Sequence, residues 1–324
     1  MSSQTFLDPA ILFFIFGMLA GLMRSNLDIP QPISRFLSLY LLMALGLKGG
    51  FALSKSGLTG EVAGTLSLAV LLAFVIPLLS YWVLKQIVDR YDAAAISATF
   101  GSVSAVTFIT ATQYLDNMGL PFGGHMAAAM ALMESPAIIL AVVLANVIRR
   151  KQEARVSTQV TPLSEVLREA LTDGAQLLLM GAMLIGLISG AAGEAAMKPF
   201  TGDLFKGMLA FFLLDMGLQA ARHIGGLKGQ SPWLLVYALL APLVHAALAL
   251  GLCIMTGVSA GNAALLMVLA ASASYIAVPA VIRHAIPEAN PTLYLSLSLG
   301  LTFPFNILFG IGLYAQVAQW ALGQ

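Results

Sequence analysis

Charged residues are scarce in this chain. Asp, Glu, Lys and Arg make up 10% of the 324 residues, whereas 59% are hydrophobic and the mean hydropathy is +0.90. Because soluble domains contain about 25% charged residues, the composition predicts a multi-pass membrane protein whose solvent is the lipid bilayer. The formal net charge of +1 comes without a concentrated basic face, so we expect no nucleic acid among the partners.

The chain also lacks the usual signatures of enzymes. Its single cysteine, Cys253, lies in an apolar run, which excludes an internal disulfide or a cysteine cluster for a metal and predicts a buried side chain. Nothing resembles a phosphate-binding glycine loop, a zinc motif or the strained turn that carries a nucleophilic serine. We therefore expect neither catalysis nor a bound cofactor.

Long apolar runs are abundant instead. About 20 residues are needed to cross ~30 Å of hydrocarbon as a helix. Eight runs satisfy this requirement, near residues 9–23, 33–51, 61–86, 122–148, 173–193, 202–220, 231–256 and 292–319. Two more, near 92–115 and 261–286, are polar in the middle. The sequence therefore predicts ten membrane spans.

The two halves of the chain resemble each other. Residues 8–22 and 173–187 are identical at 7 of 15 positions, and further pairs keep nearly the same offset: Gly46 with Gly217, Pro77 with Pro242, and Pro136 with Pro304. An odd number of spans per half turns the second half over, which predicts an all-α protein with a 5+5 inverted repeat. The expected parts are residues 1–150, a linker at 151–170 with a lead-in helix at 162–171, and residues 171–324.

Glycines spaced by four recur in the repeated segment, and such spacing lets membrane helices approach closely. They are Gly17, Gly21, Gly186 and Gly190.

The distribution of basic residues predicts the orientation, because positively charged loops stay cytoplasmic. We place the basic segment Arg149–Arg155 on the cytoplasmic side. Of the 16 Lys and Arg residues, only four then lie outside, Lys48, Lys55, Lys198 and Lys206. The same orientation puts both termini outside. The first run has no basic lead-in and no small-residue cleavage site, so we expect it to be retained as a span.

The two polar-centred spans occupy equivalent places in the repeat, and each has a Ser-x-Ser motif beside a helix-breaking glycine or proline. Helices broken in mid-membrane present N–H groups that attract an anion and carbonyls that hold a cation. We expect the two interruptions to cross and share one small ligand. The alternative is that the hydroxyls bond their own helices. The expected substrate-binding residues are Gly101, Ser102, Ser104, Thr107, Ser272 and Ser274.

Glu134 is an ionisable residue inside an apolar span, where a carboxylate is costly unless it is paired or faces a cavity. Pro136 follows it and frees a carbonyl one turn earlier, which gives a set of oxygen ligands that suits Na⁺. The alternative is a neutral Glu134 hydrogen-bonded within the helices. For Asp215, nearer a helix end, a structural role is expected.

These residues resemble the SbtA-type sodium-dependent bicarbonate transporters of cyanobacteria and other bacteria, and the resemblance covers nearly the whole chain. It is carried by Gly46–Gly50, Phe100–Thr107, Met133–Ala137, Ala241–His245, Ala271–Pro279 and Arg283–Pro291. The resemblance implies a gate domain of spans 1, 2, 6 and 7, a core domain of spans 3–5 and 8–10, and a homotrimer. It further implies elevator-like uptake of bicarbonate with Na⁺ across the bacterial cytoplasmic membrane, with a PII-like cytoplasmic regulator.

The chain departs from that family's pattern in the second broken helix, where Tyr275 replaces a usual acidic residue. The expected cation-binding residues are Glu134, Ser104, Ser274, Tyr275 and Thr302, with Na⁺ at Glu134. Because one carboxylate is left near the site, proton coupling through Glu134 is the alternative. A carrier of another small carboxylate or anion, or an anion channel, is the alternative function.

Overall fold

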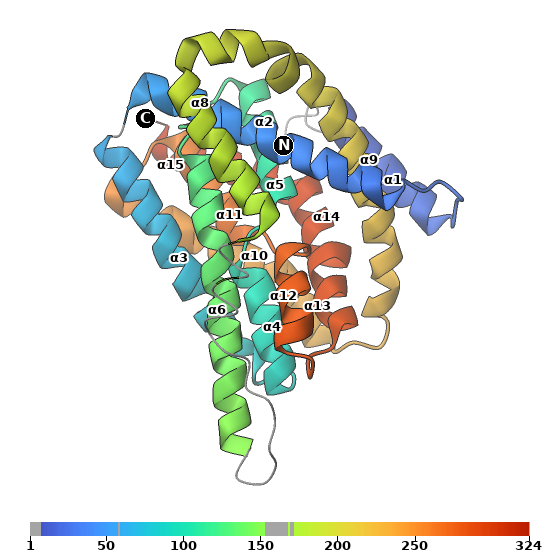
Figure 1. Ribbon diagram of the computed structural model, residues 1–324. Coiled ribbons are helices and arrows are strands. Elements are labelled where there is room, and N and C mark those ends of the chain that lie inside the picture. The colour runs from blue at the N-terminus through green and yellow to red at the C-terminus, as the bar shows by residue number, and fades with distance from the viewer. Residues whose placement is uncertain (1–7, 58, 153–167, 169–171, 324) are drawn as a thin grey trace.

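The computed structural model describes residues 8–57, 59–152, 168 and 172–323, and all regular secondary structure in these residues is helical (Figure 1). The first half contains α1 (Pro9–Leu22), α2 (Gln31–Ser56), α3 (Gly60–Leu84), α4 (Arg90–Gly101), α5 (Ala105–Met118) and α6 (Met126–Gln152). The second contains α8 (Gly174–Lys198), α9 (Leu204–Ile224), α10 (Pro232–Thr256), α11 (Ala260–Ala271), α12 (Ala277–Ala285), α13 (Pro291–Leu297), α14 (Phe303–Phe305) and α15 (Ile311–Leu322). Short π-helical turns, η2 (Pro199–Asp203), η4 (Ser298–Thr302) and η5 (Asn306–Gly310), join some of them.

The prediction of an all-α membrane protein is confirmed. Among the described residues, seven helical segments are long and apolar enough to cross a membrane, and the segment Gly174–Leu227 includes both α8 and α9. Helices α1 and α11 are apolar but shorter. Helices occupy each of the ten ranges expected from the sequence, whereas ten crossings in a 5+5 repeat stay a prediction. The predicted lead-in helix and most of the linker lie outside the described residues.

The repeated segments of the sequence begin with the same local structure. Asp8 accepts a hydrogen bond from the N–H of Ala10 at 2.8 Å, and Asp173 accepts bonds from the N–H groups of Ala175 and Gln176 at 3.0 Å. Each aspartate satisfies N–H groups that a helix start leaves unpaired. The similarity between residues 8–22 and 173–187 thus includes an equivalent helix start.

Helices α1 and α9 pack tightly through small residues. A Cβ atom at Gly17 would collide with the carbonyl oxygen of Leu214, and a Cβ at Gly217 would collide with that of Phe14. Contact between backbones over small residues is a common way to join helices in lipid, where no hydrophobic force drives them together. Any larger side chain at these positions would separate the two helices.

Helices α2 and α8 repeat this arrangement. A Cβ at Gly50 would collide with the Met183 carbonyl oxygen, and one at Gly186 would lie 2.6 Å from that of Leu47. Gly190 differs from the expectation of close packing. Its φ of 54° and ψ of −142° are non-helical, and the nearest atom to an added Cβ is 3.8 Å away. It bends α8, which glycine permits because it lacks a Cβ.

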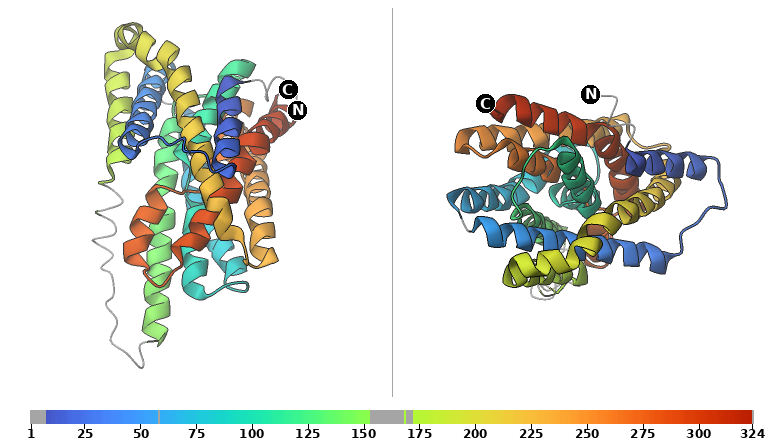
Figure 2. Two further views of the ribbon diagram at one scale, coloured as in Figure 1. Left: turned by 90° about the vertical axis from the view of Figure 1, so that its right-hand side faces the viewer. Right: turned by 90° about the horizontal axis from the view of Figure 1, so that it is seen from above.

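The two pairs form a group of four helices, because α2 also contacts α9. Figure 2 shows this group along one side of the molecule, with the remaining helices beside it. In that second group, α3 contacts α4 and α6, α10 contacts α11, and α11 contacts α15. The interrupted helices α4/α5 and α11/α12 lie within it. Helices α4, α5 and α11 are mostly buried, and α12 is buried on one face.

Candidate functional site

The two interrupted helices meet at their breaks. Helix α4 ends at Gly101 and α5 begins at Ala105, while α11 ends at Ala271 and α12 begins at Ala277. The Ser104 N–H donates to the Ser272 hydroxyl at 3.0 Å, and the Ser274 N–H donates to the Thr99 carbonyl at 2.7 Å. Residues 102–104 and 272–276, here called the crossing, therefore lie against each other.

Four helix ends converge at the crossing. The N-termini of α5 and α12 carry partial positive charge, and the C-termini of α4 and α11 carry partial negative charge. An anion is stabilised by the first pair of ends and a cation by the carbonyl oxygens of the second pair. The crossing can therefore hold ions of both signs close together without a full charge of its own.

Ser104 and Ser274 act as acceptors at the starts of the following helices. The Ser104 hydroxyl accepts from the Thr107 N–H at 3.2 Å and from the Thr107 hydroxyl at 3.0 Å, and the Ser274 hydroxyl accepts from the Val278 N–H at 3.3 Å. A hydroxyl that accepts in this way still has its own proton to donate. Both residues are buried, so these two protons are the best-placed side-chain donors for an anion.

The other expected anion ligands serve mainly to build the crossing. The Ser102 hydroxyl donates to the Glu134 carbonyl at 3.3 Å, and the Ser272 hydroxyl donates to the Leu269 carbonyl at 2.9 Å. A Cβ at Gly101 would lie 2.5 Å from the Pro77 ring of α3. Gly101 thus allows α4 to pack against α3, and the two serines fix the backbone around the break.

Asn306 contributes to the crossing although its sequence pattern gave no indication of this. Its amide donates to the Ala271 carbonyl at the end of α11 at 2.8 Å, and its carbonyl oxygen accepts from the Tyr314 hydroxyl at 3.0 Å. Both side chains are buried. They hold one of the carbonyls that the break leaves without a helical partner, a contact that only the packing of η5 against α11 produces.

Glu134 faces two ways. Its backbone carbonyl accepts from Ser102 at the crossing, whereas its carboxylate accepts from the Gln176 amide of α8 at 2.9 Å. The same amide lies 3.3 Å from the Ala131 carbonyl and 3.4 Å from the Ser135 hydroxyl. The carboxylate is therefore engaged at the contact between α6 and the four-helix group.

The remaining expected cation ligands have partners in different places. The Tyr275 hydroxyl donates to the Met216 sulfur of α9 at 3.5 Å and lies near the Ser104 side chain. The Thr302 hydroxyl donates to the Ala238 carbonyl of α10 at 2.8 Å. Asp215, next to Met216, is buried and hydrogen-bonded to Ser34 and Gln219. Tyr275 is thus the member of the set through which the crossing contacts α9.

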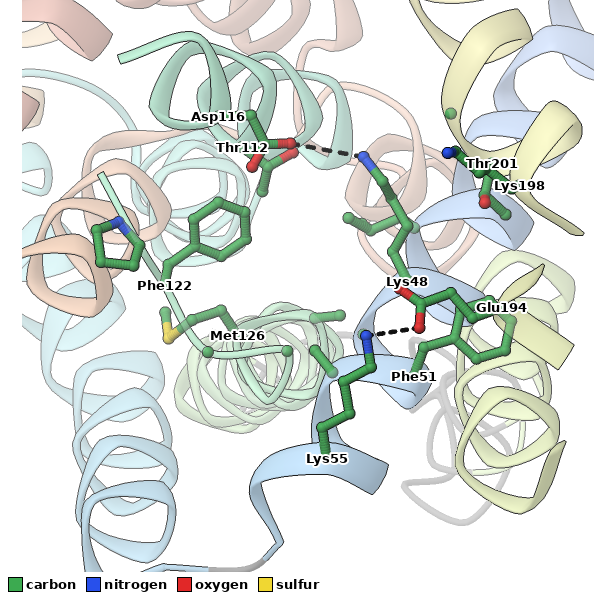
Figure 3. Close-up of a pocket in the computed structure, with 18 of the residues that line it drawn as sticks. Lys48, Phe51, Lys55, Thr112, Asp116, Phe122, Met126, Glu194, Lys198 and Thr201 are labelled. Atoms are coloured by element: carbon green, nitrogen blue, oxygen red, sulfur yellow. Dashed lines mark ion pairs between the residues drawn. The ribbon is translucent and has the colours of Figure 1, made fainter. Parts of the chain in front are cut away.

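A large cavity lies beyond the crossing, towards the C-terminal end of α5. It has a volume of about 670 Å³ and is lined by α2, α5, the loop before α6, α8 and η2. Lys48 pairs with Asp116 at 3.5 Å, and Lys55 pairs with Glu194 at 2.6 Å. Figure 3 shows both pairs at the cavity, together with Lys198. We call this space the Lys198 cavity.

The opposite end of α6 is fixed by a charge pair. The buried Arg149 guanidinium donates to the Glu288 carboxylate at 2.8 and 2.6 Å and to the Ala285 carbonyl at 3.0 Å. These hydrogen bonds lower the pKa of Glu288 below its ordinary value of 4.5. The pair joins α6 to the loop between α12 and α13, and so helps to position the second broken helix.

Comparison with known proteins identifies a family. A family model described as the Na⁺-dependent bicarbonate transporter superfamily matches residues 9–319. No curated protein sequence matches the chain significantly. The matched range includes both broken helices, the charge pair of Arg149 and every residue expected at the site. The chain therefore belongs to the Na⁺-dependent bicarbonate transporter superfamily.

Proposed function

We propose that this protein takes up bicarbonate together with Na⁺ by alternating access, with the crossing as the substrate site. The observation that carries the proposal is the buried meeting of two broken helices, where the Ser104 and Ser274 protons and two helix N-termini favour a small anion. Bicarbonate carries one negative charge and several acceptor oxygens. A site for bicarbonate therefore needs hydrogen-bond donors in a small space, and it does not need a positively charged side chain.

The coupling ion is proposed to bind beside the anion. The C-termini of α4 and α11 provide carbonyl oxygens, and Glu134 on α6 reaches Ser102 with its backbone carbonyl. Its carboxylate accepts from Gln176 and would bind the ion after turning towards the crossing. Oxygen ligands of this kind suit Na⁺ at broken helices. Tyr275 replaces the family's acidic residue and offers a neutral hydroxyl, so this site depends more on Glu134 and on the backbone. Opposite charges at adjacent sites favour joint binding, because each ion reduces the cost of burying the other.

The same helices suggest how the site moves. We propose that α1, α2, α8 and α9 form a gate, and that α3–α6 and α10–α15 form a core that slides against it as an elevator. The supporting observation is that the equivalent packing of α1 with α9 and of α2 with α8 joins the gate helices backbone to backbone. The crossing is built from core helices, and its Tyr275 side chain contacts Met216 of the gate helix α9. A core that moves as a unit would thus carry the bound ions with it.

The internal duplication supports the 5+5 inverted repeat on which this motion depends. Gly21 on α1 and Gly186 on α8 are equivalent in the duplicated sequence, as are Gly46 on α2 and Gly217 on α9. In space, Gly21 packs on α9 and Gly186 packs on α2. Equivalent residues therefore make equivalent contacts in the two halves, as a pseudo-two-fold axis requires.

Three further features are part of the proposal: membership of this family implies the first and the third, and the basic residues predict the second. The protein is a homotrimer in the bacterial cytoplasmic membrane, both termini lie outside, and a PII-like regulator acts on the cytoplasmic face. The orientation rests on the placement of Arg149 and the basic residues that follow it.

Proton coupling is the second candidate, and the Glu134–Gln176 contact favours it. A carboxylate whose partner is a neutral amide at the boundary between gate and core can exchange a proton when that boundary opens. In this case Glu134 would carry the proton, and the carbonyls of the crossing would need no metal ion. The two mechanisms differ in the ion gradient that drives uptake.

The test is uptake of labelled bicarbonate into proteoliposomes under an inward Na⁺ gradient, a proton gradient or no gradient. We expect accumulation with Na⁺ alone at constant pH. If only the proton gradient drives accumulation, the coupling ion is H⁺ rather than Na⁺, and Glu134 is the residue that carries it. Absence of uptake under every gradient, from protein that remains folded and trimeric, would exclude bicarbonate as the substrate.

A further inference from the structure

We infer that the Lys198 cavity is an anion-collecting vestibule that selects by charge and passes anions to the crossing. The inference rests on the proposed function for the identity of the transported ion. It does not rest on it for the existence of the binding site. The site would take small inorganic anions in hydrated form, with the Lys198 ammonium as the group that holds them.

The first argument is the charge on the cavity wall. Three lysines and two carboxylates line it, and the two carboxylates are paired with Lys48 and Lys55. Among the residues that the structure describes, Lys198 has no ion-pair partner. The wall therefore keeps one positive charge that is free to attract an anion. An ammonium group presents three donors and no acceptor.

The second argument is the position of the cavity. Its lining includes Phe108 on α5, whose N–H bonds the Ser104 carbonyl at 3.0 Å. Phe108 thus lies one helical turn, about 6 Å along the axis, beyond Ser104 at the crossing. From there α5 passes Thr112 to Asp116 at the rim. Phe108 is buried and no residue of the crossing lines the cavity, so an anion collected at Lys198 reaches the crossing when the core moves and Phe108 is displaced.

The third argument concerns which groups can donate to an anion. The two threonine hydroxyls in the lining are already engaged, since Thr112 donates to the Ile109 carbonyl at 2.8 Å and Thr201 donates to that of Met197 at 3.1 Å. This leaves the lysines as the side-chain donors. The volume of about 670 Å³ is roughly twenty times that of a water molecule in the liquid. The ion therefore stays hydrated, and the cavity distinguishes the sign of the charge rather than the shape of the anion.

The size of the effect follows from Coulomb's law. One unit charge at about 8 Å from an anion in water contributes roughly 0.5 kcal/mol, which is about twofold in local concentration. The effect is screened when the Debye length falls below that distance. Removing the Lys198 charge should therefore reduce uptake about twofold at bicarbonate concentrations below KM. It should leave the maximal rate unchanged, and the reduction should disappear at high salt.

The control is Lys206, a second lysine that differs from Lys198 in its position relative to the cavity. Lys206 is exposed, is predicted to lie on the same side of the membrane, and does not line the cavity. K198M, K198E, K198R and K206M are compared in proteoliposomes at low and high ionic strength. We expect K198E to reduce subsaturating uptake more than K198M, and K198R and K206M to resemble the wild type. Equal behaviour of K198M and K206M would overturn the inference.

A direct measurement of binding separates this inference from the proposed function. Wild-type protein is acetylated with acetic anhydride at fixed pH in rising bicarbonate, and the modification of Lys198 relative to Lys206 is measured by mass spectrometry. We expect bicarbonate to slow the acetylation of Lys198 relative to Lys206 by at most about twofold, and chloride to do so to a similar degree because the cavity does not distinguish anions by shape. A constant ratio would overturn the inference. Protection of Lys198 in protein that moves no bicarbonate would uphold the vestibule and refute only the proposed substrate.

Discussion

The crossing and the Lys198 cavity both include residues of or next to helix α5, yet they differ in the groups that form them. At the crossing, buried hydroxyls and helix ends are fixed by hydrogen bonds, such as that from the Ser104 N–H to Ser272 at 3.0 Å. The cavity has long charged side chains around a wide space, and its pair Lys48–Asp116 is 37% and 45% exposed. Fixed dipoles can distinguish anions by geometry, whereas mobile charges in water can distinguish only their sign.

Under the proposed function, this difference would assign selection among anions to the crossing, and collection by sign of charge to the cavity. Two of the donors proposed for selection, Ser104 and Ser274, cap helices and so have little freedom to adapt to another anion. Lys198 has no such restraint among the described residues. Substitutions at the crossing should therefore be costly and specific, while those in the cavity should be mild and sensitive to salt.

The largest effect is expected at the crossing. Ser104→Ala and Ser274→Ala each remove a hydroxyl donor to a charged ligand, a loss of about 1.5–3 kcal/mol. Bicarbonate affinity should therefore fall at least tenfold for each variant. Ser97→Ala is the matched control, because Ser97 is a buried serine of α4 that bonds the Ala94 carbonyl of its own helix. Concentration series of bicarbonate uptake measure the effect, and wild-type affinity in both variants would remove these hydroxyls from the site.

The next effect concerns coupling. Glu134→Gln removes the charge but keeps an acceptor for Gln176, and Gln176→Met removes the contact but keeps the charge. If the carboxylate binds the cation, Glu134→Gln should weaken the dependence of uptake on Na⁺ or protons, and Gln176→Met should not. The half-maximal cation concentration should rise about tenfold in Glu134→Gln. Cation titrations of uptake test this. An equal loss in both variants would show that Glu134 acts through the contact between α6 and α8.

Sequence reasoning located the crossing because its signal is local. A Ser-x-Ser motif beside a glycine or proline in two equivalent spans is visible in the printed sequence, and the helices do stop at Gly101 and Ala271. Glycine spacing likewise indicated the packing of Gly17 and Gly186. Periodicity and helix breaking depend on neighbours in the chain, so they can be predicted without knowing the fold.

The partners of these residues could not be predicted in this way. Gln176 meets Glu134, and Asn306 meets Ala271, across separate helices. Gly101 was expected as a ligand for its flexibility, yet its lack of a side chain also permits contact with Pro77. The charges of the Lys198 cavity come from three separate helices, α2, α5 and α8. Such contacts depend on how helices are placed relative to one another, which a local pattern does not determine.

A charge pair outside both regions shows how burial increases the contribution of an ion pair to stability. Arg149 is 3% exposed and Glu288 is 30% exposed, with two hydrogen bonds between them. Glu288→Gln should destabilise the protein by about 2 kcal/mol, because it leaves a buried guanidinium without its countercharge. The exposed pair of Lys55 and Glu194, 59% and 43% exposed, supplies the control, and Glu194→Gln should cost less than about 1 kcal/mol. Unfolding measurements in detergent give both values, and equal values would contradict the effect of burial.

The same pair predicts a pH dependence. The pKa of Glu288 is lowered in the folded protein relative to its ordinary value of 4.5, so its contribution to stability is fully present above about pH 4.5. It is lost as the pH falls through the lowered pKa of the folded state. Stability measured from pH 7 to pH 3 should therefore decrease less steeply in Glu288→Gln than in the wild type. Parallel curves would show that the pair does not titrate with folding.

The smallest effect is expected for the pair that spans the proposed gate and core. Lys48 on α2 and Asp116 on α5 are 3.5 Å apart and exposed, and the Lys48 ammonium also lies 4.8 Å from the centre of the Phe205 ring. Such a pair contributes less than about 1 kcal/mol, which changes the ratio of two conformations by less than about fivefold. If the core slides along the gate, the pair can form in only one of its positions. Lys48→Met and Asp116→Asn should therefore each alter the uptake rate slightly and in the same direction, and the double variant should show no further change. Strictly additive effects in this cycle would mean that the two residues act independently, each through its own charge on the cavity wall.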